Sequence, residues 1–310
     1  MRLSPSRPRK GTSLIELLVA LVLFSLFGAI ALVQLSTNGR SLTALTDRLD
    51  AQSALWHGGD VAATELRPIS PPAGDILLAT DSSIWYRGLV AAGLLCAPPS
   101  GNSLLLLPDS LASGVRPGTG VSTAQAGDVA YLLDEGPTPG AADDRWLSAT
   151  VSSVSSVSGL CAGSPLVDPV RDAGRRGYRV QLQPSSLPAT VSVGAGVRIV
   201  RASRLALYRS SPDWFLGWTD WNTSLGAWNI IQPVAGKFRP YGAAPRPTGV
   251  GITMADSLGA WVTIPGVTTN GSTLDLAIRT EVLTRQLGVG PTQALRTDSL
   301  AVRVALRNRQ

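Results

Sequence analysis

One acidic residue, Glu16, lies at the start of a long apolar segment, and its position is the strongest chemical signal in the sequence. No charged residue follows it between Leu17 and Val33. Residues 14–33 would form a helix of about 30 Å at ~1.5 Å per residue, which is enough to cross the hydrocarbon core of a bilayer. A carboxylate at the centre of such a helix costs about 2.5–3.5 kcal/mol, and less near the interface. We therefore expect Glu16 to have a partner; the alternative is a side chain that only extends to the cytoplasmic interface.

A short basic segment precedes the apolar run. Its charges are all positive and come from Arg2, Arg7, Arg9 and Lys10. By the positive-inside rule, these residues hold the N-terminus in the cytoplasm. Gly11 follows them and separates them from the apolar run.

Three interpretations of this N-terminus are open. It is a secretory signal peptide, for which Ala29-Ile30-Ala31 formally provides a cleavage site, although that site lies inside the apolar run. It is a plain membrane anchor that is not processed. The third interpretation depends on a resemblance to a known family, which the residues at the junction of the basic and apolar segments carry.

The segment KGTSLIELLVAL, from Lys10 to Leu21, resembles the N-terminal leader of type IV pilins and pseudopilins. In that family, prepilin peptidase cleaves after a glycine and methylates the new N-terminus, and the fifth mature residue is a glutamate. Counted from Thr12, Glu16 is the fifth residue. Thr12 itself departs from the Phe or Met that is usual there. The resemblance implies that Gly11 and Thr12 flank the processed bond, and that Glu16 pairs with the methylated amine of a neighbouring subunit.

The apolar segment must be carried by a long helix. We expect a leader at residues 1–11, a transmembrane helix at 12–34 and an amphipathic continuation at 35–67. A stripe of large apolar residues recurs at helical spacings through Leu35, Leu42, Leu45, Leu49 and Trp56. We expect this stripe to lie on a β-sheet, Gly58-Gly59 to kink or break the helix, and Pro68 to end it.

The rest of the chain, residues 68–310, reads as a β-rich globular body. Short runs alternate apolar and polar residues between turns rich in Pro, Gly and Asp, and no long helical pattern separates them. The predicted strands are Ile76–Thr80, Ser103–Leu107, Asp128–Leu133, Trp146–Val154, Tyr178–Leu182, Val197–Val200, Arg204–Tyr208, Val250–Met254, Trp261–Ile264, Thr273–Leu283 and Ser299–Arg307. The sequence therefore predicts an α+β fold, in which a long N-terminal helix packs on an antiparallel β-sheet body.

Two cysteines, Cys96 and Cys161, are too far apart in the sequence for a CxxC motif, and no histidines cluster near them. Metal binding and thioredoxin-type chemistry are therefore poor interpretations. In an oxidising compartment we expect one disulfide, which would stabilise the fold by roughly 4 kcal/mol on the chain-entropy model. The alternative is two unrelated buried thiols.

The sequence offers no convincing catalytic site. The only histidine, His57, lies on the predicted helix, so most triads and zinc sites are excluded, although a pair of catalytic carboxylates remains open. The acidic doublets Asp134-Glu135 and Asp143-Asp144 fit solvated turns better than a calcium loop. Four tryptophans between Trp214 and Trp228 indicate a packed irregular loop, or else a binding surface. We expect no enzyme activity, no cofactor and no metal.

The charge distribution argues against nucleic-acid binding. Four of the six net positive charges come from the basic N-terminal segment, so +2 remains for the rest of the chain. Bulk electrostatic binding of nucleic acid needs a clustered basic face instead.

The resemblance implies a minor pilin or pseudopilin that initiates or caps a type IV pilus or a type II secretion pseudopilus. Lys237–Gln310 loosely resembles the C-terminal part of large minor pilins of the PilW type and of J-type pseudopilins. Its partners would be prepilin peptidase, other pilin or pseudopilin subunits and inner-membrane lipid. The body would lie in the periplasm or outside the cell. The alternative is a membrane-anchored exported binding protein or enzyme, which would need neither Gly11 nor Glu16.

Overall fold

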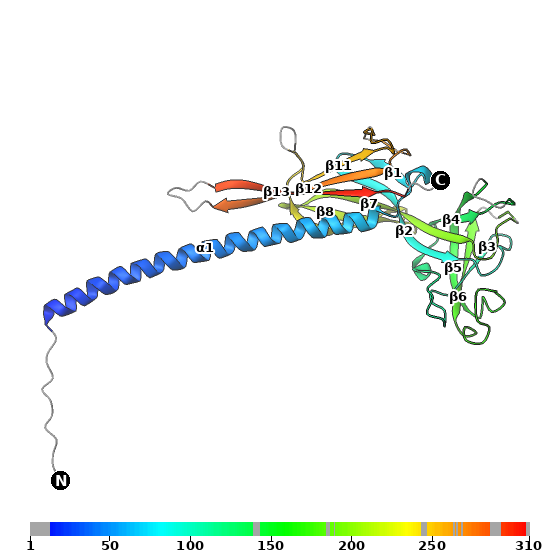
Figure 1. Ribbon diagram of the computed structural model, residues 1–310, viewed down its shortest axis with the longest axis horizontal. Coiled ribbons are helices and arrows are strands. Elements are labelled where there is room, and N and C mark those ends of the chain that lie inside the picture. The colour runs from blue at the N-terminus through cyan, green and yellow to red at the C-terminus, as the bar shows by residue number, and fades with distance from the viewer. Residues whose placement is uncertain are drawn as a thin grey trace, which may run out of the picture. The chain divides into compact units, whose positions relative to one another are not determined.

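The structure is a computed structural model that describes residues 13–138, 143–183, 187–188, 190–242, 247–262, 264, 266–267, 269–285 and 293–307. One long helix and antiparallel β-sheets make an α+β fold, as the sequence predicts (Figure 1). The helical elements are α1 (Leu14–Leu66), η1 (Pro71–Ala73) and η2 (Val121–Thr123). The strands are β1 (Ile76–Ala79), β2 (Ser83–Leu94), β3 (Ser103–Leu106), β4 (Val129–Asp134), β5 (Arg145–Ser158), β6 (Arg176–Gln183), β7 (Gly196–Ser210), β8 (Asp213–Asn222), β9 (Ala227–Trp228), β10 (Gln232–Phe238), β11 (Val250–Ala255), β12 (Thr273–Arg285) and β13 (Gln293–Ala305).

The chain forms two compact units. One contains residues 1–52 and 282–296, and the other contains residues 53–281 and 297–310. The helix α1 contributes to both, because it runs for 53 residues without interruption. It ends at Leu66, just before Pro68, which confirms the predicted end.

The predicted kink or break at Gly58-Gly59 is wrong, because α1 continues through both glycines. Their role is close packing. A Cβ atom on Gly58 would lie 3.2 Å from Phe238 Cζ and 3.3 Å from Ala235 Cβ. On Gly59 it would lie 2.9 Å from both Leu300 Cδ2 and Val302 Cγ2. The helix therefore tolerates two residues of low helix propensity because they bring its backbone onto the sheets.

We expect Gly59→Leu to destabilise the second unit by about 1–3 kcal/mol, because the new side chain overpacks the contact with Leu300 and Val302. This loss exceeds the gain of up to about 1 kcal/mol from better helix propensity. Urea unfolding of the full chain in detergent measures the effect. Gly39→Leu is the matched control on the same helix, since a Cβ atom there would meet nothing within 4 Å. Equal stability of the two variants would contradict the packing role.

The predicted leucine stripe does not make the contact between α1 and the sheets. Leu45 is 54% exposed and Trp56 is 69% exposed, and the other members of the stripe are exposed as well. The buried residues are instead Ala54, Leu55 and Ala62, followed by Leu66 at the helix end. Two leucines and two alanines therefore bury this face, and the alanines, like Gly58 and Gly59, let the helix lie close to the sheets.

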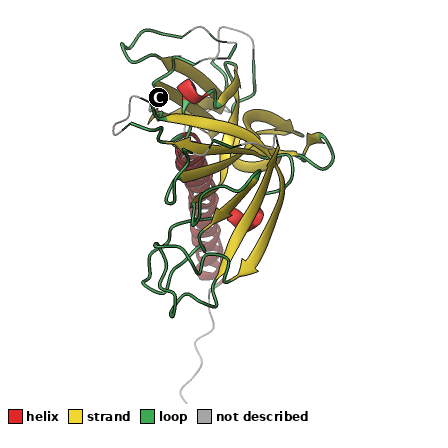
Figure 2. Cartoon of the chain, turned by 90° about the vertical axis from the view of Figure 1, so that its right-hand side faces the viewer, coloured by secondary structure: helices red, strands yellow, loops and turns green. Residues whose placement is uncertain are grey.

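Figure 2 shows the strands of the chain in yellow and its helices in red. The larger sheet is organised around β2 and β7, which pair along most of their length, from Ser83 opposite Ala206 to Leu94 opposite Gly196. The other edge of β7 is divided between two strands. Its first part, Val197–Val200, pairs with β4, and its second part, Ser203–Ser210, pairs with β8. Every strand pairing with a described register is antiparallel, as predicted.

We call this division of the β7 edge between β4 and β8 the fork in β7. Because of the fork, the second unit has two large hydrophobic cores. One lies between the end of α1 and strands that include β1, β8, β11 and β12. The other lies among β3, β4, β5 and β6. Both cores use β2 and β7, so the two long strands join them.

Arg201 lies at the fork in β7, between the residues that pair with β4 and those that pair with β8. Its Nε lies 2.7 Å from Asp128 Oδ1, and its Nη1 lies 3.1 Å from Asp220 Oδ2. The hydrogen bond with Asp128 is the main reason that the pKa of Arg201 is raised. Because the Asp128 side chain is fully buried, the guanidinium compensates a charge that would otherwise be costly.

Most predicted strands correspond to a strand of the structure, whether their residues alternate, as in β12, or form a short apolar run, as in β1 and β3. Val197–Val200 and Arg204–Tyr208 belong to one strand, β7, and the strands β2 and β10 were not predicted. Trp261 forms only an isolated bridge with Ala255. The stretch of four tryptophans, predicted to be irregular, contains β8 and β9, because pairing with β7 and β10 overrides its Gly and Asp content.

Candidate functional site

Glu16 lies in the first turn of α1, where it caps its own helix. Its Oε2 accepts a hydrogen bond from Ser13 N at 3.1 Å, and Ser13 Oγ accepts one from Ile15 N at 3.4 Å. The reciprocal arrangement is a capping box, which satisfies amide groups that the helix itself leaves unpaired. The sequence signal was Ser13-Leu14-Ile15-Glu16, a Ser-x-x-Glu motif directly before an apolar run, and the sequence analysis overlooked it.

The cap fixes the position of the Glu16 carboxylate at the start of the helix. It holds Glu16 at the N-terminal end of α1, where the helix dipole favours a negative charge. The carboxylate therefore lies within the first turn of α1. Gly11 and Thr12, which the sequence predicts to flank the processed bond, lie outside the described residues.

The first part of α1 has the length and composition of a membrane span. An 18-residue window within it has a mean hydropathy of 2.6, and none of that window is buried in the protein. Large apolar side chains such as Phe24, 80% exposed, and Leu32, 70% exposed, point away from the chain. Such a surface needs lipid or other apolar helices around it.

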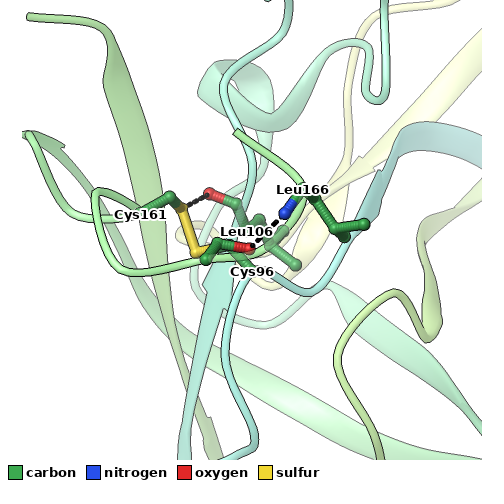
Figure 3. Close-up of a disulfide and its surroundings, with 5 residues drawn as sticks. Cys96, Leu106, Cys161 and Leu166 are labelled. Carbon is green, nitrogen blue, oxygen red and sulfur yellow. Dashed lines mark hydrogen bonds between the residues drawn. A yellow bond between two sulfur atoms is a disulfide. The ribbon is translucent and has the colours of Figure 1, made fainter. Parts of the chain in front are cut away.

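Cys96 and Cys161 form the predicted disulfide (Figure 3). Their Cα atoms are 5.6 Å apart, and both residues are buried beside Leu107. Cys161 Sγ also lies 3.3 Å from the carbonyl oxygen of Leu106. The bond ties the chain just after β2 to the connection between β5 and β6. It therefore braces the second of the two cores.

One residue of each acidic doublet, Asp134 in the first and Asp143 in the second, serves the local structure. Asp134 is fully buried and pairs with Arg145 Nε at 3.0 Å. Its pKa is lowered, mainly by a hydrogen bond with the Thr190 side chain and also by Arg145, against the opposing effect of burial. Asp143 Oδ2 accepts from Thr138 N at 3.0 Å. Within the described part of the chain, no three His, Cys, Asp or Glu residues are grouped to hold a metal ion.

The tryptophans of β8 and β9 separate into two groups. Trp214 and Trp218 pack against the first core. Trp221 and Trp228 face each other edge to face, with ring centroids 5.5 Å apart, and Trp228 meets Trp85 at 5.2 Å in the same way. The predicted packing role is therefore confirmed for Trp214 and Trp218. His57 is exposed on α1.

Comparison with known protein families gives one match. Residues 6–32 match the family described as the prokaryotic N-terminal methylation motif. No curated protein and no solved structure matches the chain. The match covers Arg7, Arg9 and Lys10 of the basic segment, together with Gly11, Glu16 and most of the apolar run. It therefore identifies a prepilin-type N-terminus of the kind found in type IV pilin-like proteins, and it leaves the body unassigned.

Proposed function

We propose that the chain is a minor pilin or pseudopilin, a structural or initiating subunit of a type IV pilus or a type II secretion pseudopilus. The observation that carries the proposal is the methylation motif at the head of one unbroken 53-residue helix. The motif implies processing by prepilin peptidase. Proteins that carry it are typically structural subunits rather than enzymes.

The proposed division of the chain follows from this function. Residues 1–11 are the leader that the peptidase removes, and residues 12–34 hold the subunit in the inner membrane. Residues 35–67 continue the helix outside the membrane and carry the exposed leucines. Residues 68–310 form the body in the periplasm or beyond.

During assembly, the helix moves from the lipid of the membrane to the interior of the filament. In the membrane, lipid covers the exposed apolar residues of α1, and in the filament, helices of other subunits cover them. Glu16 would meet the methylated N-terminal amine of a neighbouring subunit, which neutralises both charges and sets the axial register. The helical position of Glu16 and the exposure of the helix support this step.

The size of the body favours a minor subunit. Two hydrophobic cores joined by long shared strands make a bulky head for a repeating filament. Such a head is tolerated more easily at a filament end, where neighbours lie on one side only. An initiating or tip position is therefore the role that we propose.

We expect Gly11→Leu to abolish processing, because a leucine side chain does not fit a peptidase cleft that accepts glycine. A reduction of at least about tenfold in cleavage rate corresponds to about 1.4 kcal/mol in the barrier. Mass spectrometry of the membrane-extracted protein should find a mature wild-type chain that begins at N-methylated Thr12, and an intact leader in the variant. Thr12→Phe is the matched control and should be cleaved normally. A wild-type chain that retains Met1 would overturn the proposed function.

A further inference from the structure

A pocket of about 300 Å³ lies beside η1, where the end of α1, the larger sheet and the C-terminal segment meet. Four of its lining residues can bind a ligand through their side chains, namely Asp144, Trp146, Arg198 and Arg307. The connection after α1 forms one wall, and Arg307 N donates to Ile69 O at 2.8 Å. Its volume is at the lower end of the range of roughly 300–1,000 Å³ that is usual for small-molecule sites.

The sheet places the functional side chains on one face. Arg198 in β7 is directly opposite Tyr131 in β4, and Trp146 in β5 is opposite Leu133 in β4. Tyr131 and Leu133 are two residues apart on one strand, so they point to the same side. Arg198 and Trp146 are therefore neighbours, and the Arg198 guanidinium lies over the Trp146 ring, with Cζ 5.9 Å from the ring centroid.

Arg198 is held firmly in position before any ligand arrives. Its Nη2 lies 2.9 Å from Oδ2 of the fully buried Asp75, which also accepts from Ser70 N at 2.9 Å. The guanidinium also lies 5.8 Å from the centroid of the Tyr131 ring. A side chain that is already ordered loses little entropy on binding, so it is well suited to recognise a ligand.

The charges around the pocket favour an anion. Two guanidinium groups, those of Arg198 and Arg307, line the pocket. A third, that of Arg87, is not part of the lining but adjoins Arg198 through Tyr131, whose OH accepts a hydrogen bond from Arg87 Nη1 at 2.6 Å. Two carboxylates oppose them, those of Asp75 and Asp144. One positive charge is therefore left over, and guanidinium groups pair with carboxylates through two parallel hydrogen bonds.

Trp146 and Asp144, which also line the pocket, indicate which kind of anion it binds. The Trp146 ring offers a flat apolar surface of the kind on which the face of a sugar ring packs. Asp144 offers acceptors for hydroxyl groups. We propose that this pocket binds an acidic monosaccharide, with the carboxylate at Arg198 and Arg307, the sugar ring on Trp146 and a hydroxyl at Asp144. This inference does not depend on the methylation motif or on filament assembly.

To test this proposal, D-galacturonate is titrated into the full chain in detergent micelles at low salt, and calorimetry measures its dissociation constant. We expect a Kd on the order of 1 mM for a ligand of this size. Arg307→Gln should weaken binding about tenfold, and Trp146→Leu should weaken it by a similar factor. Arg307 is exposed, so its substitution should leave thermal unfolding unchanged.

The controls separate a specific site from general attraction. Arg171→Gln removes the same charge at an exposed position that does not line the pocket, and it should bind galacturonate like the wild type. D-galactose, which lacks the carboxylate, should bind at least about tenfold more weakly. Absence of galacturonate binding, equal binding of galactose, or an equal loss in Arg171→Gln would each overturn the proposal. Loss of processing or assembly in other variants would not affect it.

Discussion

Glu16→Ala should insert into the membrane normally and fail to enter filaments. The apolar run is long enough to anchor the chain without this residue, and the substitution removes a charge that is costly in lipid. What it removes from assembly is the proposed pairing with the amine of a neighbouring subunit. We expect the filament fraction to fall by at least about tenfold, the equivalent of about 1.4 kcal/mol. Immunoblots of sheared filaments and of membranes measure the two populations.

The capping box adds a second explanation that must be separated from the first. Glu16→Ala also removes the acceptor for Ser13 N, and the lost cap alone would cost the helix about 0.5–2 kcal/mol. Glu16→Gln distinguishes the two, because its amide oxygen still caps Ser13 N but carries no charge. If charge pairing matters, Glu16→Gln fails to assemble like Glu16→Ala. If it assembles like the wild type, the register mechanism is wrong and Glu16 acts only as a cap.

A matched control exists on the same helix. Asp47→Ala removes an exposed carboxylate from the proposed extramembrane part of α1 and should leave assembly unchanged. An equal defect in this variant would show that filament entry depends on the total charge of the helix.

Removing the disulfide should cost about 4 kcal/mol of stability in the second unit. Cys96 and Cys161 are separated by 65 residues, and the chain-entropy model assigns about 4 kcal/mol to the closure of a loop of that size. The double variant Cys96→Ala with Cys161→Ala avoids leaving a free thiol or a buried hydroxyl. Urea unfolding of the full chain in detergent, with and without dithiothreitol, measures the effect. The reduced wild type should match the double variant.

The loss should be local as well as large. The disulfide joins segments around the second core, so amide hydrogen exchange should rise in β5 and β6. The amides of β11, which packs in the first core, should stay protected. A change of less than about 1 kcal/mol, or equal exposure of both cores, would contradict a bracing role for this bond.

The N-terminal features could be predicted from the sequence because they depend on neighbours in the chain. The spacing of Gly11 and Glu16 and the long apolar run are local patterns, and they identify the motif that the family comparison also finds. The end of α1 before Pro68 is equally local, since proline disfavours helix in the residue before it. The disulfide was predictable because the chain has only two cysteines to pair.

Other features depended on contacts between distant segments. Read alone, Gly58-Gly59 signals a helix break, and the exposed leucines signal a buried stripe. Both interpretations are wrong in the folded protein. Leu300 and Val302 approach Gly59 so closely that only a small residue fits there, and the leucines of the stripe stay exposed. Strand β8 was missed for the same reason, since its pairing with β7 outweighs its local composition.

The fork in β7 and the pocket beside η1 depend entirely on the tertiary structure. Arg201 meets Asp128 and Asp220 only because β4 and β8 share one edge of β7. Arg198 and Trp146 are 52 residues apart in the sequence and come together through the pairing of three strands. The sequence by itself determined the prepilin-type motif and the long apolar helix of this protein, since both depend on consecutive residues. Only the fold could bring together side chains whose proximity depends on strand register.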